Sequence, residues 1–276
     1  MAERKLSVTM VEAKKARAGT AIVTGASGAI GAAIARGLAA RGFEVVLVVR
    51  DQGRGERAEA AIRRAVPGAR LQVHAVDLAR RSAITSFARS FAGPLEILVN
   101  NAARAPRRRE ETPEGIETQL ATNVLGYAWM IDAFAEALAR AAPARVVNVA
   151  SYWAGDLDLD DLEFRRRRYD NGTAYRQSKQ ANRMLTVLEA EQLAPSGVSV
   201  NVCHPGDVDS TLSNSLGFGG SATPDEGAAT PLWLATSPDV KDQSGGYFER
   251  MRKVSCSFAR DRKGIERLYE ACRRFS

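Results

Sequence analysis

Short apolar runs alternate with longer alanine-rich segments along nearly the whole chain. In the longer segments apolar side chains recur every three or four residues, as at Ile30, Ile34 and Leu38, which predicts amphipathic helices. The short runs are rich in valine, leucine and isoleucine and predict buried strands. These strands are expected at Thr20–Thr24, Val45–Val49, Leu71–Val76, Ile97–Val99, Val146–Ala150 and Val198–Cys203.

Strands that alternate with helices are the sequence pattern of an α/β fold with a doubly wound parallel sheet. In such a fold, functional side chains gather where the carboxyl ends of the strands meet. The chain has 276 residues, 45% of them hydrophobic, which is enough to bury one large core. We therefore expect a single Rossmann-type domain over residues 19–276, with its chemistry in residues that directly follow strands.

Three segments depart from the alternation. Residues 1–18 are polar and basic and are expected to form a flexible leader. Segments 155–174 and 212–224 are polar, arginine-rich or glycine-rich, and each lies just beyond a predicted strand end. That position favours substrate loops over domain linkers.

The net charge of +7 comes largely from arginine runs, which include Arg107–Arg109 and Arg165–Arg168. No aromatic side chains are interleaved with these runs, so a solvated surface is favoured and no nucleic-acid partner is expected. For Arg165–Arg168 a solvated helix face is favoured. The alternative is contact with a carboxylate or phosphate of a substrate.

Cysteines, histidines and long apolar runs are scarce. The three cysteines form no CxxC pair and there are only two histidines, so neither a disulfide framework nor a metal site is expected. No run approaches eighteen apolar residues, and the N-terminus lacks an apolar secretory region. We predict a soluble, cytoplasmic protein without a transmembrane anchor.

The stretch TGASGAIG places Gly25, Gly28 and Gly31 between the first strand and the first helix. Glycines at this spacing allow a tight turn and bring helix N–H groups close to a pyrophosphate, which predicts a dinucleotide site. A glycine-rich turn without ligand is the alternative. A nucleophile elbow centred on Ser27 is disfavoured, because position 29 is alanine and no histidine partner is evident.

The second strand ends in VVLVVRD, so Arg50 occupies the position where an acidic residue would bind an NAD ribose. A guanidinium suits a 2′-phosphate, and Arg54 follows closely, so NADP(H) is favoured over NAD(H). Asp51 is one residue away from reversing this preference. Asp77 is placed to bond the adenine or to cap a helix, and Asn101 and Ala102 lie where backbone lines the cofactor.

Ser151 follows the fifth predicted strand, and AYRQSK places Tyr175 and Lys179 four residues apart. On a helix this spacing puts phenol and ammonium on one face. An adjacent ammonium stabilises a phenolate, so Tyr175 can exchange a proton with a substrate oxygen that Ser151 holds by a hydrogen bond. A surface Tyr–Lys pair is the alternative.

These motifs, together with VNVCHPGDVDSTL and SGGYF, resemble the short-chain dehydrogenase/reductase family. The resemblance is closest to its retinol dehydrogenase-like group, which includes relatives of protochlorophyllide reductase. It implies a Rossmann-type fold, a Ser–Tyr–Lys site and an asparagine that holds a water linked to the lysine, matched here by Asn123. It also implies that Pro205 and Gly206 border the nicotinamide, and that Ser210 or Thr211 reaches the carboxamide.

Two positions depart from the family's motifs. Ala29 stands where the middle glycine of TGxxxGxG is usual, and Ala103 replaces the glycine of NNAG. Both are interpreted as altered turns that remove no catalytic group. The complete predicted cofactor site comprises Gly25, Ser27, Gly28, Ile30, Gly31, Arg50, Arg54, Asp77, Leu78, Asn101, Ala102, Tyr175, Lys179, Pro205, Gly206, Val208 and Ser210.

The combined motifs predict an NADPH-dependent reductase that converts an aldehyde or ketone to an alcohol, or catalyses the reverse oxidation. Reduction of a C=C bond and a non-catalytic NADP(H)-binding regulator are the alternatives. Tyr152 and Trp153 are explained equally by a bulky, partly aromatic or lipophilic substrate and by core packing, and the expected lack of an anchor disfavours a retinoid. Helices expected at Glu114–Ala141 and Tyr175–Leu193 resemble those that pair subunits in the family, which favours a homodimer or homotetramer, although monomers also occur in the group.

Overall fold

The computed structural model describes residues 19–275, and the predicted leader at 1–18 lies outside this range. One sheet contains eight strands in the order β3-β2-β1-β4-β5-β6-β7-β8. Strands β1 to β7 run parallel, and β8 pairs antiparallel with β7. The strands are β1 Thr20–Thr24, β2 Glu44–Val49, β3 Arg70–Ala75, β4 Ile97–Asn100, β5 Ala144–Val149, β6 Val198–His204, β7 Tyr247–Glu249 and β8 Arg252–Val254.

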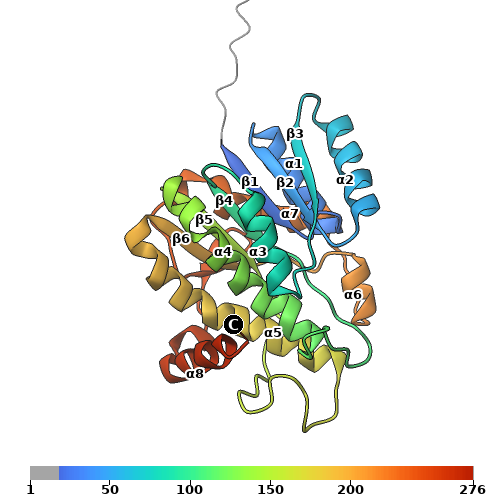
Figure 1. Ribbon diagram of the computed structural model, residues 1–276, viewed down its shortest axis with the longest axis vertical. Coiled ribbons are helices and arrows are strands. Elements are labelled where there is room, and N and C mark those ends of the chain that lie inside the picture. The colour runs from blue at the N-terminus through green and yellow to red at the C-terminus, as the bar shows by residue number, and fades with distance from the viewer. Residues whose placement is uncertain (1–18, 276) are drawn as a thin grey trace, which may run out of the picture.

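Helices cover both faces of this sheet (Figure 1). Helices α1, α2 and α7 pack on one face, and α3, α4 and α5 on the other, where α8 lies beside α5 (Figure 1). The doubly wound single domain predicted from the sequence is thereby confirmed. The helices are α1 Ala29–Ala40, α2 Gln52–Ala65, α3 Arg81–Ser90, the π-helix η1 Leu120–Leu125, α4 Gly126–Arg140, α5 Asn171–Leu193, α6 Thr211–Ser215, α7 Pro224–Thr236 and α8 Arg262–Arg273, with short 3₁₀ turns at Ala194–Ser196, Pro238–Val240 and Phe258–Arg260.

The central strands β1, β2 and β4 are almost entirely apolar because both faces of the sheet are buried there, whereas the edge strands β3 and β8 carry exposed polar side chains. Successive side chains of β1 point to opposite faces: Ile22 packs with the α3–α5 layer, whereas Ala21 and Val23 pack with the α1–α7 layer. All six predicted strands are present, with ends that differ by up to two residues. The three-residue strands β7 and β8 were not predicted, since so short a run carries no periodic signal.

The expected helix Glu114–Ala141 starts too early. Gly115 has a positive φ of 80°, Glu111 bridges Glu117, and helical structure begins only at Thr118, just before the π-helix η1. The buried carboxylate of Glu117 accepts the N–H groups of Gln119 (2.8 Å) and Leu120 (2.7 Å), which satisfies donors at the start of the helix. Burial raises the pKa of this carboxyl group. Hydrogen bonding therefore determines this boundary, and the apolar spacing does not.

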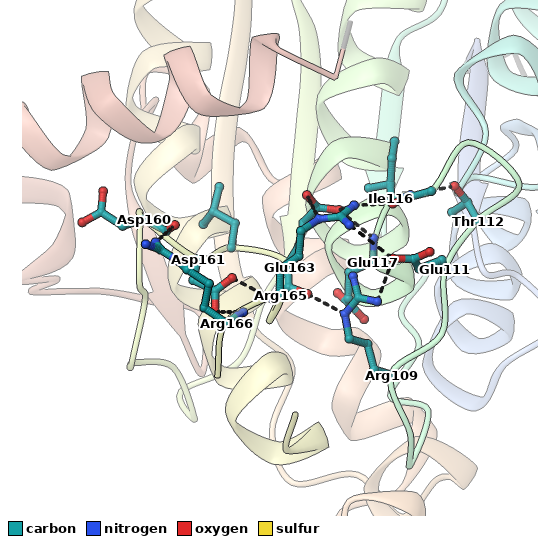
Figure 2. Close-up of polar contacts among 12 residues, drawn as sticks. Arg109, Glu111, Thr112, Ile116, Glu117, Asp160, Asp161, Glu163, Arg165 and Arg166 are labelled. Atoms are coloured by element: carbon teal, nitrogen blue, oxygen red, sulfur yellow. Dashed lines mark hydrogen bonds and ion pairs between the residues drawn. The ribbon is translucent and has the colours of Figure 1, made fainter. Parts of the chain in front are cut away.

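The arginine run Arg165–Arg168 is not on a helix, which corrects the expected helix face. Its segment is irregular, and three successive backbone N–H groups, from Arg165 to Arg167, donate to the carboxylate of Asp161. The Arg165 guanidinium lies 3.0 Å from Glu163 and 3.6 Å from Glu111, and Arg109 donates to the Glu163 carbonyl (2.8 Å), as Figure 2 shows. These arginines therefore tie loop 155–174 to the segment before η1.

Buried polar side chains connect β5 with the helix layer. Asn148 donates to Glu189 of α5 (2.9 Å), while Asp132 of α4 and Cys272 of α8 also face that carboxyl group. Burial raises the pKa of Glu189 to about 8, opposed by the Asn148 hydrogen bond and reinforced by Asp132. Folding therefore favours the neutral acid.

Stability should fall as pH rises, because Glu189 ionises in the unfolded chain near its ordinary pKa but only near pH 8 in the folded state. Its contribution is fully present below the unfolded pKa and is lost as pH rises through the folded one. Between about pH 5 and pH 9 the Tm of wild type should therefore fall by roughly 5–10 °C more than the Tm of a Glu189→Gln variant. Glu191→Gln, at an exposed ion pair with Arg262, is the control, and parallel Tm curves for wild type and Glu189→Gln would contradict the assignment.

A helix that spans a membrane requires both sufficient length and apolar character. Across residues 19–275, no helix combines the length and apolar character needed to cross a bilayer.

Candidate active site

A cavity of about 620 Å³ opens at the carboxyl ends of strands β1 to β5, beside the reversal of strand order between β1 and β4. All predicted cofactor residues line it except Gly206 and Val208. Tyr175 and Lys179 line one end, and Arg50 and Arg54 also contribute to its wall. Residues far apart in the sequence are thus collected around one space.

The glycine turn is locked against the end of β4. Gly25 has a φ of 65°, and a Cβ there would lie 2.8 Å from the Cα of Ala102. The Thr24 hydroxyl accepts the N–H groups of Asn101 (2.8 Å) and Ala102 (3.1 Å), and Asn101 returns a hydrogen bond to the Thr24 carbonyl (2.9 Å). Close approach of two backbones therefore explains why a side chain is not tolerated at position 25.

Helix α1 begins at Ala29 with Gly28 as its N-cap, and no side chain caps it. Its first N–H groups and the positive end of its dipole therefore suit an anionic group in the cavity. Gly28 has a φ of −87°, and its Cβ would meet only the Gly25 carbonyl oxygen, at 3.3 Å. The departure at Ala29 is accommodated because that residue is already helical.

Two arginines and one acid define the end of the cavity near β2. Arg50 and Arg54 are exposed and line the cavity. Asp51 is the N-cap of α2, and its carboxylate accepts the Arg54 N–H at 2.7 Å. The acid is therefore engaged with the helix start, which leaves two cationic side chains as the charged groups available to a phosphate.

Asp77 lies at the cavity wall but does not cap a helix, so that alternative is wrong. Its carboxylate accepts the N–H of Ala79 (3.1 Å) in a turn, and α3 starts only at Arg81 after the N-cap Arg80. Nearby, the buried Thr122 hydroxyl also lines the cavity and has no hydrogen-bond partner within the described residues. A polar group orphaned at a cavity wall fits a site whose remaining partner is a ligand.

Three of the four predicted catalytic side chains, Ser151, Tyr175 and Lys179, lie together; Tyr175 and Lys179 line the other end of the cavity, whereas Ser151 is outside its lining. The Lys179 ammonium donates to the Val149 carbonyl at 2.9 Å and lies 5.5 Å from the centre of the Tyr175 ring. The Ser151 hydroxyl is hydrogen-bonded to Tyr175 and accepts the N–H of Trp153 (3.0 Å). All three side chains are buried, with Lys179 only 2% exposed.

Burial shifts the acid–base properties of this pair. It raises the pKa of Tyr175 to about 12, a shift that the Ser151 hydrogen bond opposes. It lowers the pKa of Lys179 to about 7. Both shifts follow from loss of water around the charged form, so a neighbouring charge in the site will move both groups strongly.

Asn123 lies in the π-helix η1 and is fully buried, outside the cavity lining. Its amide brackets the backbone of Arg104, accepting from the N–H (2.8 Å) and donating to the carbonyl (2.9 Å), and it also donates to Ser178 (3.2 Å). Irregular turns of this kind are frequent at functional sites. Asn123 therefore fixes the loop after β4 beside the helix that carries Lys179.

The predicted residues after β6 divide into two groups. Pro205 and Ser210 line the cavity, and Ser210 caps α6 through a bond to the Ser213 N–H (3.1 Å). Val208 is buried, with its N–H bound to the Gly206 carbonyl (3.1 Å). The structure therefore places Gly206 and Val208 behind the cavity wall.

The comparisons with known proteins agree with this geometry. The family model for short chain dehydrogenases matches residues 19–217. This chain belongs to the short-chain dehydrogenase family. A probable oxidoreductase of Streptomyces antibioticus is 37% identical, covering 83% of this chain and 84% of that protein, and mouse retinol dehydrogenase 13 is 33% identical, covering 91% and 81%. A metagenomic short-chain oxidoreductase in complex with NADP is 30% identical with a TM-score of 0.61, covering 80% and 92%.

The resemblance to the retinol dehydrogenase-like group is confirmed by these relatives. Short-chain dehydrogenases are oxidoreductases that use NAD(P)(H) with small-molecule substrates. As a member of this family, the protein is an oxidoreductase. The cavity residues fit such a dinucleotide: a glycine turn and an uncapped helix start for the pyrophosphate, and an orphaned hydroxyl and two arginines elsewhere on the wall.

Sequence reasoning missed Arg104 and Thr122 in the wall of this short-chain dehydrogenase's cavity. Arg104 follows the strand-end motif NNAA and forms an ion pair with Glu110 (3.1 Å), which also lines the cavity. The position of Arg104 directly after a strand could have indicated it. Thr122 lies within a helical periodic pattern, which carries no signal for a cavity.

Proposed function

We propose that this short-chain dehydrogenase reduces an aldehyde or ketone to an alcohol with NADPH, or oxidises the alcohol with NADP⁺. The observation that carries the proposal is the arrangement of three groups: Tyr175 and Lys179 line one end of the dinucleotide-sized cavity, and Ser151 lies beside Tyr175. Tyr175 and Lys179 share a buried helix face, and Ser151 is bonded to the phenol. A buried phenol beside an ammonium is suited to proton exchange with an oxygen atom.

The bound cofactor would supply or accept a hydride at its nicotinamide ring. The Ser151 hydroxyl would hold the carbonyl oxygen of the substrate, and Tyr175 would deliver its phenolic proton to that oxygen as negative charge develops there. The Lys179 ammonium, held by the Val149 carbonyl, would stabilise the phenolate that remains. Burial excludes water from all three groups and strengthens these interactions.

NADP(H) is favoured by the charges near β2. Arg50 and Arg54 line the cavity, while the Asp51 carboxylate is engaged at the N-terminus of α2. A phosphate on the ribose would meet two guanidinium groups, which bind phosphate in a planar, two-pronged geometry. The NADP named for the metagenomic relative supports the same preference.

The substrate is proposed to be a bulky aromatic or lipophilic carbonyl compound. Trp153 lies 6.1 Å from the Tyr175 ring and packs edge-on against Phe218 at 5.2 Å. Among the described residues, Tyr152 and Phe218 are two of the four large apolar side chains that are exposed. Tyr152 directly follows Ser151, and Phe218 contacts Trp153 just after α6; apolar exposure next to a reactive group favours an apolar ligand.

Phe218→Ala should raise KM for a bulky aryl ketone about tenfold, because the apolar contact of one ring is lost. The same variant should leave KM for a small aliphatic aldehyde within about twofold, since a small substrate does not reach the ring. Met251→Ala, at an equally exposed apolar position in the β7–β8 turn, is the matched control. Equal changes in KM for both substrates would contradict the proposed aromatic wall.

The test of the reaction follows NADPH absorbance during incubation with aldehydes, ketones and quinones. Carbonyl-dependent oxidation of NADPH with formation of the alcohol supports the proposal. NADPH-dependent saturation of a conjugated C=C bond would replace it by the first alternative. Tight NADPH binding without turnover of either substrate class would favour the regulator. The cytoplasmic location and the homodimer or homotetramer expected from the sequence remain predictions.

A further inference from the structure

Arg183 lies on α5 one helical turn after Lys179 and is 7% exposed. Its guanidinium donates to the backbone carbonyl of Ser151 and to the Tyr247 hydroxyl, at 2.6 Å for the second bond. The group also stacks on the Tyr247 ring, with 3.7 Å between the guanidinium carbon and the ring centre. Arg183 thus connects the residue that bonds the catalytic tyrosine to strand β7.

The hydrogen bonds that start at Arg183 continue through Tyr247 to the carboxylate of Glu249. Tyr247 donates its hydroxyl proton to Glu249 at the end of β7, and Glu249 pairs in register with His204 of β6. A buried arginine is costly unless its charge is compensated, and this chain of bonds delivers the compensation from the half-buried Glu249. Well-packed apolar side chains could join α5 to β7 without that cost, so joining the two elements does not by itself require an arginine.

Hydrogen bonds hold Ser151 and its neighbour Ala150 at several points. The preceding Ala150 N–H binds the Cys203 carbonyl (2.8 Å), and the Trp153 N–H binds the Ser151 hydroxyl (3.0 Å). Among residues 19–275, the Arg183 guanidinium is the side-chain group that donates a hydrogen bond to the Ser151 carbonyl. Because Ser151 lies beyond the last residue of β5, no β5 ladder bond holds that carbonyl.

We propose that Arg183 is a positioning residue that orients Ser151 toward Tyr175. The inference rests on the proposed function, in which the Ser151 hydroxyl holds the substrate oxygen. An error of about 1 Å in such a group lowers turnover without weakening cofactor binding at a distance. Arg183 touches neither the cofactor cavity nor the Tyr175 phenol among the described contacts, and its hydrogen bond to the Ser151 carbonyl is the contact that leads to the proposed site.

The experiment is a double-mutant cycle between Arg183→Met and Ser151→Ala, measured with excess enzyme in single turnovers of NADPH and an aryl ketone. Arg183→Met should lower the single-turnover rate about tenfold in the wild-type background and by less than about twofold in Ser151→Ala. The dissociation constant of NADPH should stay within about twofold. Arg183→Lys, which keeps the charge and a donor, should recover part of the rate.

The matched control is Arg145→Met. Arg145 also holds backbone carbonyls, at Leu234 (3.0 Å) and Ser237 (2.7 Å), but it lies at the start of β5 away from the site. This control should lower Tm without changing the single-turnover rate. An equal loss of rate from Arg183→Met in both backgrounds, or a loss fully explained by weaker NADPH binding, would overturn the positioning role while leaving the proposed function intact. Full turnover by Ser151→Ala, or none by wild type, would instead overturn the proposed function.

Discussion

Replacing Tyr175 by phenylalanine is expected to lower kcat about a thousandfold, because the side chain that exchanges the proton with the substrate oxygen is lost. The phenol is buried, bonded to Ser151, and close to the Lys179 ammonium, so no water is placed to substitute for it. NADPH affinity should stay within about threefold, because one hydroxyl contributes little to so large a ligand. Steady-state NADPH oxidation and fluorescence titration of NADPH measure the two quantities.

Tyr127→Phe is the matched control for this prediction. The Tyr127 ring centre is also 5.5 Å from the Lys179 ammonium, and its hydroxyl donates to the Val149 carbonyl (3.1 Å) that the ammonium shares. The control should cost about 1 kcal/mol of stability and leave kcat within about fivefold. If both phenylalanine variants reduce kcat equally, the loss of kcat comes from removing a buried hydroxyl near Lys179, and Tyr175 is not the proton donor.

The second large effect concerns the cofactor. Arg50→Ala should raise KM for NADPH about thirtyfold, since a charge-assisted bond to a phosphate contributes roughly 2 kcal/mol. KM for NADH should stay within about twofold, because a ribose without a phosphate makes no such bond. Measuring both constants on wild type and variant gives the change in cofactor preference directly.

Arg57→Ala is the control for the cofactor prediction, because Arg57 is exposed on the same helix as Arg54 but does not line the cavity. It should leave both constants unchanged. The combined variant Arg50→Ala with Arg54→Ala should weaken NADPH further. Equal increases of KM for NADPH and NADH would show that Arg50 supports the turn without reading the phosphate.

Much of the fold follows from local patterns. The six longer strands contain runs of apolar residues because the middle of the sheet is covered on both faces, and that pattern is readable without coordinates. The start of the helical segment that leads through η1 into α4 was not readable, because it depends on the Glu117 carboxylate folding back on two N–H groups. The arginine run Arg165–Arg168 was placed on a helix for a similar reason: its backbone instead turns around Asp161, which precedes the run.

The site divides in the same way. The order of motifs along the chain is sufficient to collect the glycine turn, Ser151, Tyr175 and Lys179 at one edge of the sheet, because parallel strands present their carboxyl ends together. The chain alone therefore determined the family, the fold and most of the predicted cofactor residues that line the cavity, whereas Gly206 and Val208 lie outside the lining. Only the tertiary structure decided that Thr122 lacks a partner among the described residues and that Arg183 reaches the Ser151 carbonyl. Those outcomes depend on contacts between elements, and in a contact of this kind the partner of a polar group is set by packing in space and not by spacing along the sequence.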